Sequence, residues 1–226
     1  MENRTLGEKT ADELIRLIRE KGYRPGQKLP TEYELSGLLN VSRNTIREAL
    51  RVLVSRNIIN IRQGSGTFVS LKNGVADDPL GFSLVEDQKK LVLDLLQVRC
   101  ILEPQIAALA AENAQADDLE TLRTICEELE RLIQESKDFS QKDQDFHVQI
   151  AKCSHNIVMS NLIPTISAGV TAFSLAVSQQ EYVQTVKSHR DILQAIRARR
   201  PVEAQQAMLL HLLYNQSRFL EELNNL

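Results

Sequence analysis

The sequence of 226 residues contains no tryptophan, and aromatic residues make up only 4% of it. Its three cysteines, Cys100, Cys126 and Cys153, stand alone without a CxxC pair. Such an odd, sparse set argues against a disulfide framework and for a reducing compartment, where each cysteine would be a small core residue. Apolar stretches long enough to span a bilayer (about 20 residues) are missing, and the polar N-terminus shows no signal peptide. We therefore expect a cytosolic protein without a membrane partner.

Charge is distributed unevenly along the chain. The net charge is −3, but residues 1–74 carry 13 Lys and Arg against 8 Asp and Glu. Residues 75–226 carry 14 basic against 22 acidic residues. A basic first part joined to an acidic second part indicates that only the first meets nucleic acid. Charge alone leaves chance unevenness open as the alternative.

The first 71 residues have the pattern of three short helices followed by a hairpin. Gly22 and the Pro25-Gly26 pair end the first helix. Thr31 and Glu34 form a capping box, and Ser42 caps a third helix. Two short strands flank a glycine-containing tip at 63–66. The expected ranges are about 6–21 for the first helix, a second helix from Thr31, 43–55 for the third, and strands at 58–62 and 67–71.

The third helix carries side chains suited to reading DNA. Arg43 and Arg47 are four residues apart and share a face, and each could pair bidentately with guanine. Polar groups at the helix start suit phosphates or base edges. These residues are Ser42, Asn44 and Thr45. The alternative is a solvated charged face, with Arg47 paired to Glu48 or Glu34.

Residues 72–86 are rich in Gly, Asp and Pro, and we interpret them as a linker. Helical periodicity fills the remainder, which predicts an all-α bundle large enough to enclose a pocket. Asp117 is expected to cap the second helix of the bundle. The expected helices are 87–113, 117–136, 139–153, 157–179, 182–199 and 202–224.

All four histidines lie in this helical part. Asp143 and His147 are four apart, so both can face one point, and His189 and His211 lie on two later helices. One carboxylate and three imidazoles suit a divalent cation such as Zn²⁺ or Ni²⁺. From spacing alone, the alternative of separate polar residues on the bundle surface is favoured.

The run PGQKLPTEYELSGLLNVSRNTIREAL, followed by GSGTFV, resembles the winged helix-turn-helix of the GntR family of bacterial transcription regulators. The resemblance implies that Arg43, Arg47 and the wing residues meet DNA. These wing residues are Ser65, Gly66 and Thr67. The chain departs from the family at Tyr33, where an arginine is usual and often touches a base. We expect the operator to differ accordingly.

The later segments VRCILEPQIAALAAENA, DQDFHVQIAKCSHN and MLLHL resemble the FCD effector domain of the FadR subfamily within GntR. The resemblance implies a mainly α fold with three parts: a winged helix-turn-helix at 1–71, the linker at 72–86, and an FCD-like, all-α effector-binding and dimerisation domain at 87–226. It also implies a metal ion, zinc before nickel or manganese, and an arginine that holds a ligand carboxylate. The matching metal ligands are Asp143, His147, His189 and His211.

Arg99 matches the carboxylate-binding arginine of such domains, and its alternative role is a local ion pair with Glu103, four residues on. His155 matches no ligand position and is expected at a helix end. Asn156 matches a position often kept as Asn, without a chemistry that we could assign.

The expected function is that of a homodimeric transcription regulator on a two-fold symmetric DNA operator, controlled by a small organic acid. The resemblance favours repression relieved by the ligand. No enzyme is expected, because no HExxH-type motif supplies a base beside the metal. The alternatives are a metal-dependent, hydrolase-like enzyme fused to a DNA-binding domain, a regulator of fatty acyl thioester response, and a structural DNA-binding protein.

Overall fold

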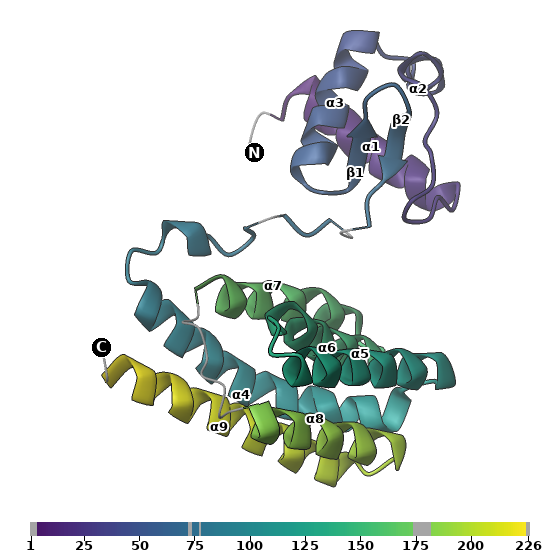
Figure 1. Cartoon of the computed structure of the whole chain (residues 1–226). Coiled ribbons are helices and arrows are strands. Elements are labelled where there is room, and N and C mark those ends of the chain that lie inside the picture. The colour runs from purple at the N-terminus through teal and green to yellow at the C-terminus, as the bar shows by residue number, and fades with distance from the viewer. Residues whose placement is uncertain (1–3, 72–73, 77, 174–181, 225–226) are drawn as a thin grey trace. The chain divides into compact units, whose positions relative to one another are not determined.

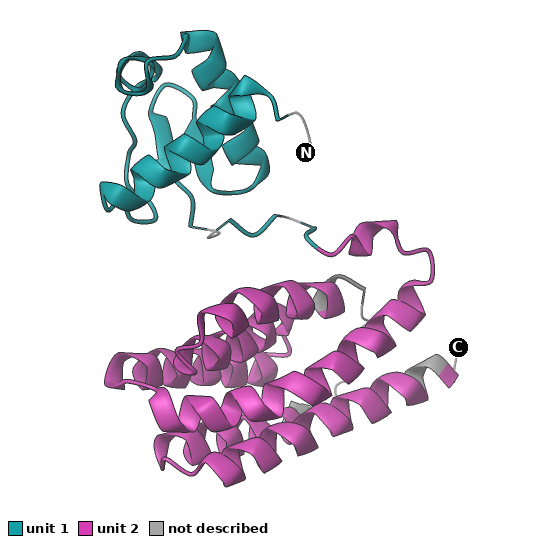
Figure 2. Ribbon diagram, turned by 180° about the vertical axis from the view of Figure 1, so that it is seen from behind, with its two compact units in different colours: residues 1–79 teal, residues 80–226 magenta. Residues whose placement is uncertain are grey.

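The computed structural model describes residues 4–71, 74–76, 78–173 and 182–224 (Figure 1). Contacts within the chain divide it into two compact units, residues 1–79 and 80–226, each described here by itself (Figure 2). The first is helical with a small hairpin, and the described part of the second is built from helices alone. The mainly α fold class predicted from the sequence is confirmed.

Three helices and a hairpin form the first unit. They are α1 (Leu6–Glu20), α2 (Glu32–Leu39), α3 (Arg43–Ser55), β1 (Ile59–Arg62) and β2 (Gly66–Val69). The capping box of Thr31 and Glu34 is present at the start of α2, and Ser42 caps α3. Asn40, with a φ of 51°, makes the tight turn between α2 and α3. Both strands are one or two residues shorter than expected at their outer ends.

The apolar faces of α1 and α3 bury one another and cover the hairpin. Leu14, Ile46, Leu53 and Ile59 are each at most 1% exposed. The two strands are antiparallel, with Arg62 opposite Gly66 at the tip. Because one face of α3 is buried in this way, its opposite face is left to solvent.

Six helices form the second unit: α4 (Gln88–Asn113), α5 (Ala116–Gln134), α6 (Ser140–Cys153), α7 (Ile157–Phe173), α8 (Tyr182–Arg197) and α9 (Pro201–Asn224). α4 contacts α6, α7, α8 and α9, whereas α5 packs against α6 and α8 (Figure 1). The core includes Ile106, Leu122, Phe146 and Ile192. Cys126 and Cys153 are also buried there.

Three expectations about this unit need correction or qualification. The expected linker holds a short 3-10 helix, Phe82–Leu84, and Phe82 packs against the bundle core. Linker residues 72, 73 and 77 lie outside the described residues. The last part of the helix expected at 157–179, residues 174–179, also lies outside them. Asp117 does not cap α5. The helix starts at Ala116, and the Asp118 carboxylate accepts the Gln115 N–H at 2.9 Å.

No helix among the described residues is long and apolar enough to cross a membrane.

Two glycines of the first unit provide a matched pair for testing the wing. Gly66 has a φ of 114°, and a Cβ there would lie 2.8 Å from Lys28 Cε, whereas Gly37 within α2 has no atom within 4 Å of its added Cβ. We predict that Gly66→Ala destabilises the first unit by about 1–3 kcal/mol, while Gly37→Ala stabilises it by about 0.5–1 kcal/mol. Calorimetry measures the change in stability of both variants, and amide hydrogen exchange measures the protection of the hairpin. An unchanged melting temperature for Gly66→Ala would contradict the wing geometry.

Candidate functional site

Four side chains that can bind a metal ion gather inside the second unit. Asp143 and His147 come from α6, His189 from α8 and His211 from α9, and one ligand atom of each lies within 4.8 Å of the others. The three histidines are at most 2% exposed, while the Asp143 side chain is 24% exposed. Three helices, α6, α8 and α9, thus bring the four residues together at one point.

Hydrogen bonds fix which nitrogen of two histidines faces the centre. The Ser188 hydroxyl donates to the Thr185 carbonyl, so its oxygen accepts from His211 Nδ1 at 2.8 Å. Glu103 accepts from His147 Nδ1 at 2.5 Å. With both protons on Nδ1, both Nε2 atoms present a lone pair, and they lie 3.3 Å apart. The Asn215 amide lies 3.1 Å from His211 Nε2 and can donate to it. A cation beside both Nε2 atoms would offset the repulsion between the two facing lone pairs, so the donor set fits a metal ion.

His189 provides a second sign of the same kind. Its Nε2 lies 3.3 Å from Asp143 Oδ1, yet neither of its buried ring nitrogens makes a hydrogen bond within the described residues. Burial, together with the nearby His147 and Arg99, lowers the pKa of His189 to about 4 although Asp143 opposes the shift. Burial also lowers the pKa of His211. Both imidazoles are therefore neutral near pH 7, which is the form that binds metals.

Glu103 connects the histidine cluster to Arg99 on the same helix, α4. Its Oε1 accepts from Arg99 Nε at 2.5 Å, while its Oε2 accepts from His147. The side chains of all three are at most 4% exposed. Burial alone would raise the pKa of Glu103, but Arg99 and His147 lower it to about 2. Glu103 is thus a buried carboxylate anion shared by a guanidinium and a metal-binding type of imidazole.

Arg99 makes the local ion pair expected as an alternative and still has a donor to spare. Its Nη2 is buried and makes no hydrogen bond among the described residues. Burial acts to lower the pKa of Arg99, but Glu103 and then Asp143 raise it. The guanidinium therefore lies close enough to the cluster to feel the charge of Asp143. The N–H groups of its Nη2 suit a carboxylate.

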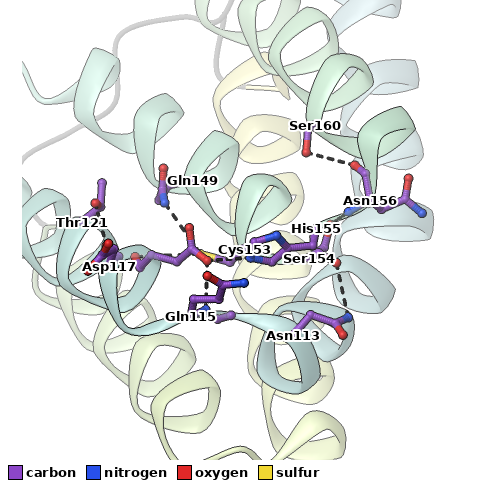
Figure 3. A network of polar contacts seen from close by, with 12 residues as sticks. Asn113, Gln115, Asp117, Thr121, Gln149, Cys153, Ser154, His155, Asn156 and Ser160 are labelled. Atoms are coloured by element: carbon purple, nitrogen blue, oxygen red, sulfur yellow. Dashed lines mark hydrogen bonds and ion pairs between the residues drawn. The ribbon is translucent and has the colours of Figure 1, made fainter.

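His155 and Asn156 lie outside this cluster, in the turn between α6 and α7 (Figure 3). His155 has a φ of 52° and its Nε2 lies 2.7 Å from the Asp118 carboxylate at the start of α5. Asn156 Oδ1 accepts the Val158 and Met159 N–H groups at 3.0 and 3.2 Å, so it caps α7. His155 thus joins the turn to the start of α5, and Asn156 fixes the start of α7.

The exposed face of α3 carries Arg43 and Arg47, as expected. Arg47 Nε donates to Glu32 Oε2 at 2.8 Å, and Arg43 Nη2 lies 3.9 Å from the same oxygen. The partner of Arg47 is therefore neither Glu48 nor Glu34. The Glu34 carboxylate is taken by the Thr31 N–H and hydroxyl at 2.7 and 2.8 Å.

The polar residues at the start of α3 differ in their exposure. Asn44 is exposed and Ser42 accepts the Thr45 N–H at 3.2 Å as the helix cap. Thr45 is only 9% exposed, and its hydroxyl lies 2.9 Å from that of Ser42. Its side chain therefore supports the helix start rather than reaching outward. Tyr33, at the start of α2, is 76% exposed.

Two cations lie at the wing, and one of them, Lys28, was not singled out by the sequence pattern. Ser65 is exposed, and Gly66 and Thr67 are half-buried. Lys28 lies over Gly66, and the Arg62 guanidinium stacks 4.6 Å from the Phe68 ring centroid. An isolated backbone bridge joins Lys28 to Phe68. Because Lys28 is distant from the wing in sequence, only the fold brings it there.

Comparison with known proteins finds matches to both parts of the chain. Residues 6–69 match the family of bacterial regulatory proteins called the gntR family, and residues 94–214 match the FCD domain. A solved structure of Streptococcus agalactiae GntR is 42% identical, with a TM-score of 0.84, and the match covers 93% of this chain and 99% of that one.

Three curated relatives from Escherichia coli K12 extend the comparison. A protein named for regulation of the L-lactate dehydrogenase operon is 34% identical, over 92% of this chain and 84% of the relative. The Glc operon transcriptional activator is 31% identical over 93% and 87%. The galactonate operon transcriptional repressor is 30% identical over 83% and 85%.

The histidines provide their own control for metal binding. We predict that the purified protein holds about one zinc ion per chain after dialysis against zinc, and that His189→Ala loses most of it because one of the four ligands is gone. His155→Ala removes an imidazole outside the cluster and should retain the metal. Elemental analysis of the folded proteins measures this. Full retention by His189→Ala would show that the ligand set is wrong.

Proposed function

Since the chain belongs to the gntR family of bacterial regulatory proteins and carries an FCD domain, we propose that a small carboxylate, bound beside a divalent metal ion in the second unit, sets the affinity of the first unit for DNA. The family relatives are transcription regulators and not enzymes. The chain is accordingly a DNA-binding transcription regulator, and the proposal concerns how it is controlled.

The observation that carries the proposal is that two buried side chains keep polar atoms without a hydrogen-bond partner among the residues that the structure describes. These atoms are both ring nitrogens of His189 and Nη2 of Arg99. Asp143, His147, His189 and His211 would hold zinc, nickel or manganese, and Arg99 would bind the effector carboxylate. When bound, the metal supplies a cation with open positions for oxygen ligands. Burying such groups without a ligand is costly, which supports a ligand as their normal partner.

Charge narrows the class of effector. A bound divalent ion requires neutral imidazoles as its ligands, so the charges to be counted are the negative charges of Asp143 and Glu103 against the positive charges of Arg99 and the ion. One positive charge remains, and a monocarboxylate balances it in a site where uncompensated charge is costly. L-lactate and galactonate, named in two relatives, are both monocarboxylates with a hydroxyl beside the carboxylate. We infer a 2-hydroxy monocarboxylate.

Glu103 supports the coupling of metal and effector, because it holds Arg99 and His147 at once. The regulator acts as a homodimer on a two-fold symmetric operator, with one first unit on each half-site. In this proposal the regulator represses transcription, and binding of the effector relieves the repression. The effect of effector on DNA affinity equals the effect of DNA on effector affinity.

Arg99→Lys tests the carboxylate site. The variant keeps the buried positive charge but loses the planar pair of donors, so we predict that it weakens binding of the effector by about 10–100-fold. Calorimetric titration of the zinc-loaded protein with L-lactate, galactonate and other 2-hydroxy acids measures the affinity. Lactamide, which lacks the carboxylate, and succinate, which has two, are the control ligands. Equal affinity of wild type and variant for the same acid would remove Arg99 from the site.

Arg47→Ala tests the DNA surface. A duplex selected by the full-length protein from a random library, called the selected duplex below, is the probe. We predict a loss of about 1–3 kcal/mol in binding free energy, because a bidentate base contact disappears. Arg16→Ala removes the same charge from an exposed position on α1 and is the control. Unchanged affinity for Arg47→Ala would exclude this arginine from the interface.

A further inference from the structure

One carboxylate lies between the two arginines of the exposed α3 face. Glu32 Oε2 accepts from Arg47 Nε at 2.8 Å and lies 3.9 Å from Arg43 Nη2. The three side chains are 34%, 50% and 59% exposed, in the order Glu32, Arg47, Arg43. Arg43 and Arg47 are like charges one turn apart, which repel each other. The position of Glu32 offsets that repulsion.

The local sequence of α2 leaves Glu32 available for this contact. Glu34 is occupied by Thr31 in the capping box. Glu32 is the first residue of α2 and is itself favoured there by the positive end of the helix. Its carboxylate crosses to α3 because the two helices pack against each other. An exposed ion pair of this kind contributes little to the free energy of folding, so stability does not explain its presence.

We propose that Glu32 is a specificity-determining residue of the DNA-binding surface, which orients Arg47 for base contact and weakens indiscriminate attraction to phosphates. The inference rests on the proposed use of α3 in DNA binding. The Glu32 contact occupies Nε of Arg47 and leaves Nη1 and Nη2 as the donor pair for a guanine edge. A guanidinium fixed in this way loses less freedom when it binds a base.

The second part of the role is electrostatic. Binding to any duplex, whatever its sequence, depends on cations that neutralise phosphates. Glu32 places a negative charge within 4 Å of two such cations, so it reduces their pull on phosphates everywhere along DNA. Specific sites regain affinity through base contacts, and other sites do not. Glu32 thereby lowers the affinity for DNA of any sequence and increases the discrimination between specific and other sequences.

The test compares wild type, Glu32→Gln, Glu32→Asp and the control Glu20→Gln in the full-length protein. Glu20 is exposed on α1, so its change alters net charge equally. Affinities are measured for the selected duplex and for a scrambled duplex of the same composition, at several KCl concentrations. For Glu32→Gln we expect tighter binding of the scrambled duplex by about 2–5-fold and a specificity ratio lowered by about tenfold.

Glu20→Gln should leave the specificity ratio at the wild-type value, and Glu32→Asp should retain part of it. A melting temperature that is unchanged in Glu32→Gln separates this role from a structural one. A wild-type ratio in Glu32→Gln would overturn the proposal. If wild type selects no sequence from the library, the proposed function fails instead, and the role of Glu32 with it.

Discussion

The buried contact of Arg99, Glu103 and His147 is the interaction on which the second unit depends. Removing one partner of a buried ion pair typically destabilises a protein by about 3–5 kcal/mol, and apolar residues of similar size would often pack as well or better. Stability is therefore a poor reason for this arrangement. A better one is chemical: Glu103 directs the proton of His147 away from the cluster and keeps Arg99 charged beside it.

The same device occurs in both units in different surroundings. In each, one carboxylate holds two cationic or potentially cationic groups: Glu103 with Arg99 and His147, and Glu32 with Arg47 and Arg43. In the interior, the low dielectric makes the interaction strong and the arrangement rigid. At the surface, water and salt weaken it, so that Glu32 orients Arg47 and reduces the attraction of the two arginines to phosphates without burying them. Burial thus decides whether the carboxylate builds a fixed site or adjusts a binding surface.

Local sequence rules predicted the starts of α2 and α3 and part of the site, but not the start of α5, where Asp117 was expected as the cap. Thr31, Ser42 and the four-residue spacing of Asp143 and His147 depend only on neighbours along one helix, and the structure has them as expected. The contact of Glu103 with His147 spans 44 residues and that of Arg47 with Glu32 spans 15. These contacts depend on how helices cross, which periodicity does not specify. In the alternative of a solvated charged face, the sequence offered Glu48 or Glu34 as the partner of Arg47. The partner is instead Glu32, because Thr31 occupies the Glu34 carboxylate.

In the proposed function, carboxylate binding in the second unit and DNA binding in the first are thermodynamically linked. The most direct measurement is a reciprocal titration of the zinc-loaded protein: affinity for the selected duplex with and without a saturating 2-hydroxy acid, and affinity for that acid with and without the duplex. Thermodynamic linkage requires the same fold-change in both directions, and we expect about 5–150-fold, as for typical coupling, and none after zinc is removed. Two affinities that do not respond to each other's ligand would contradict it.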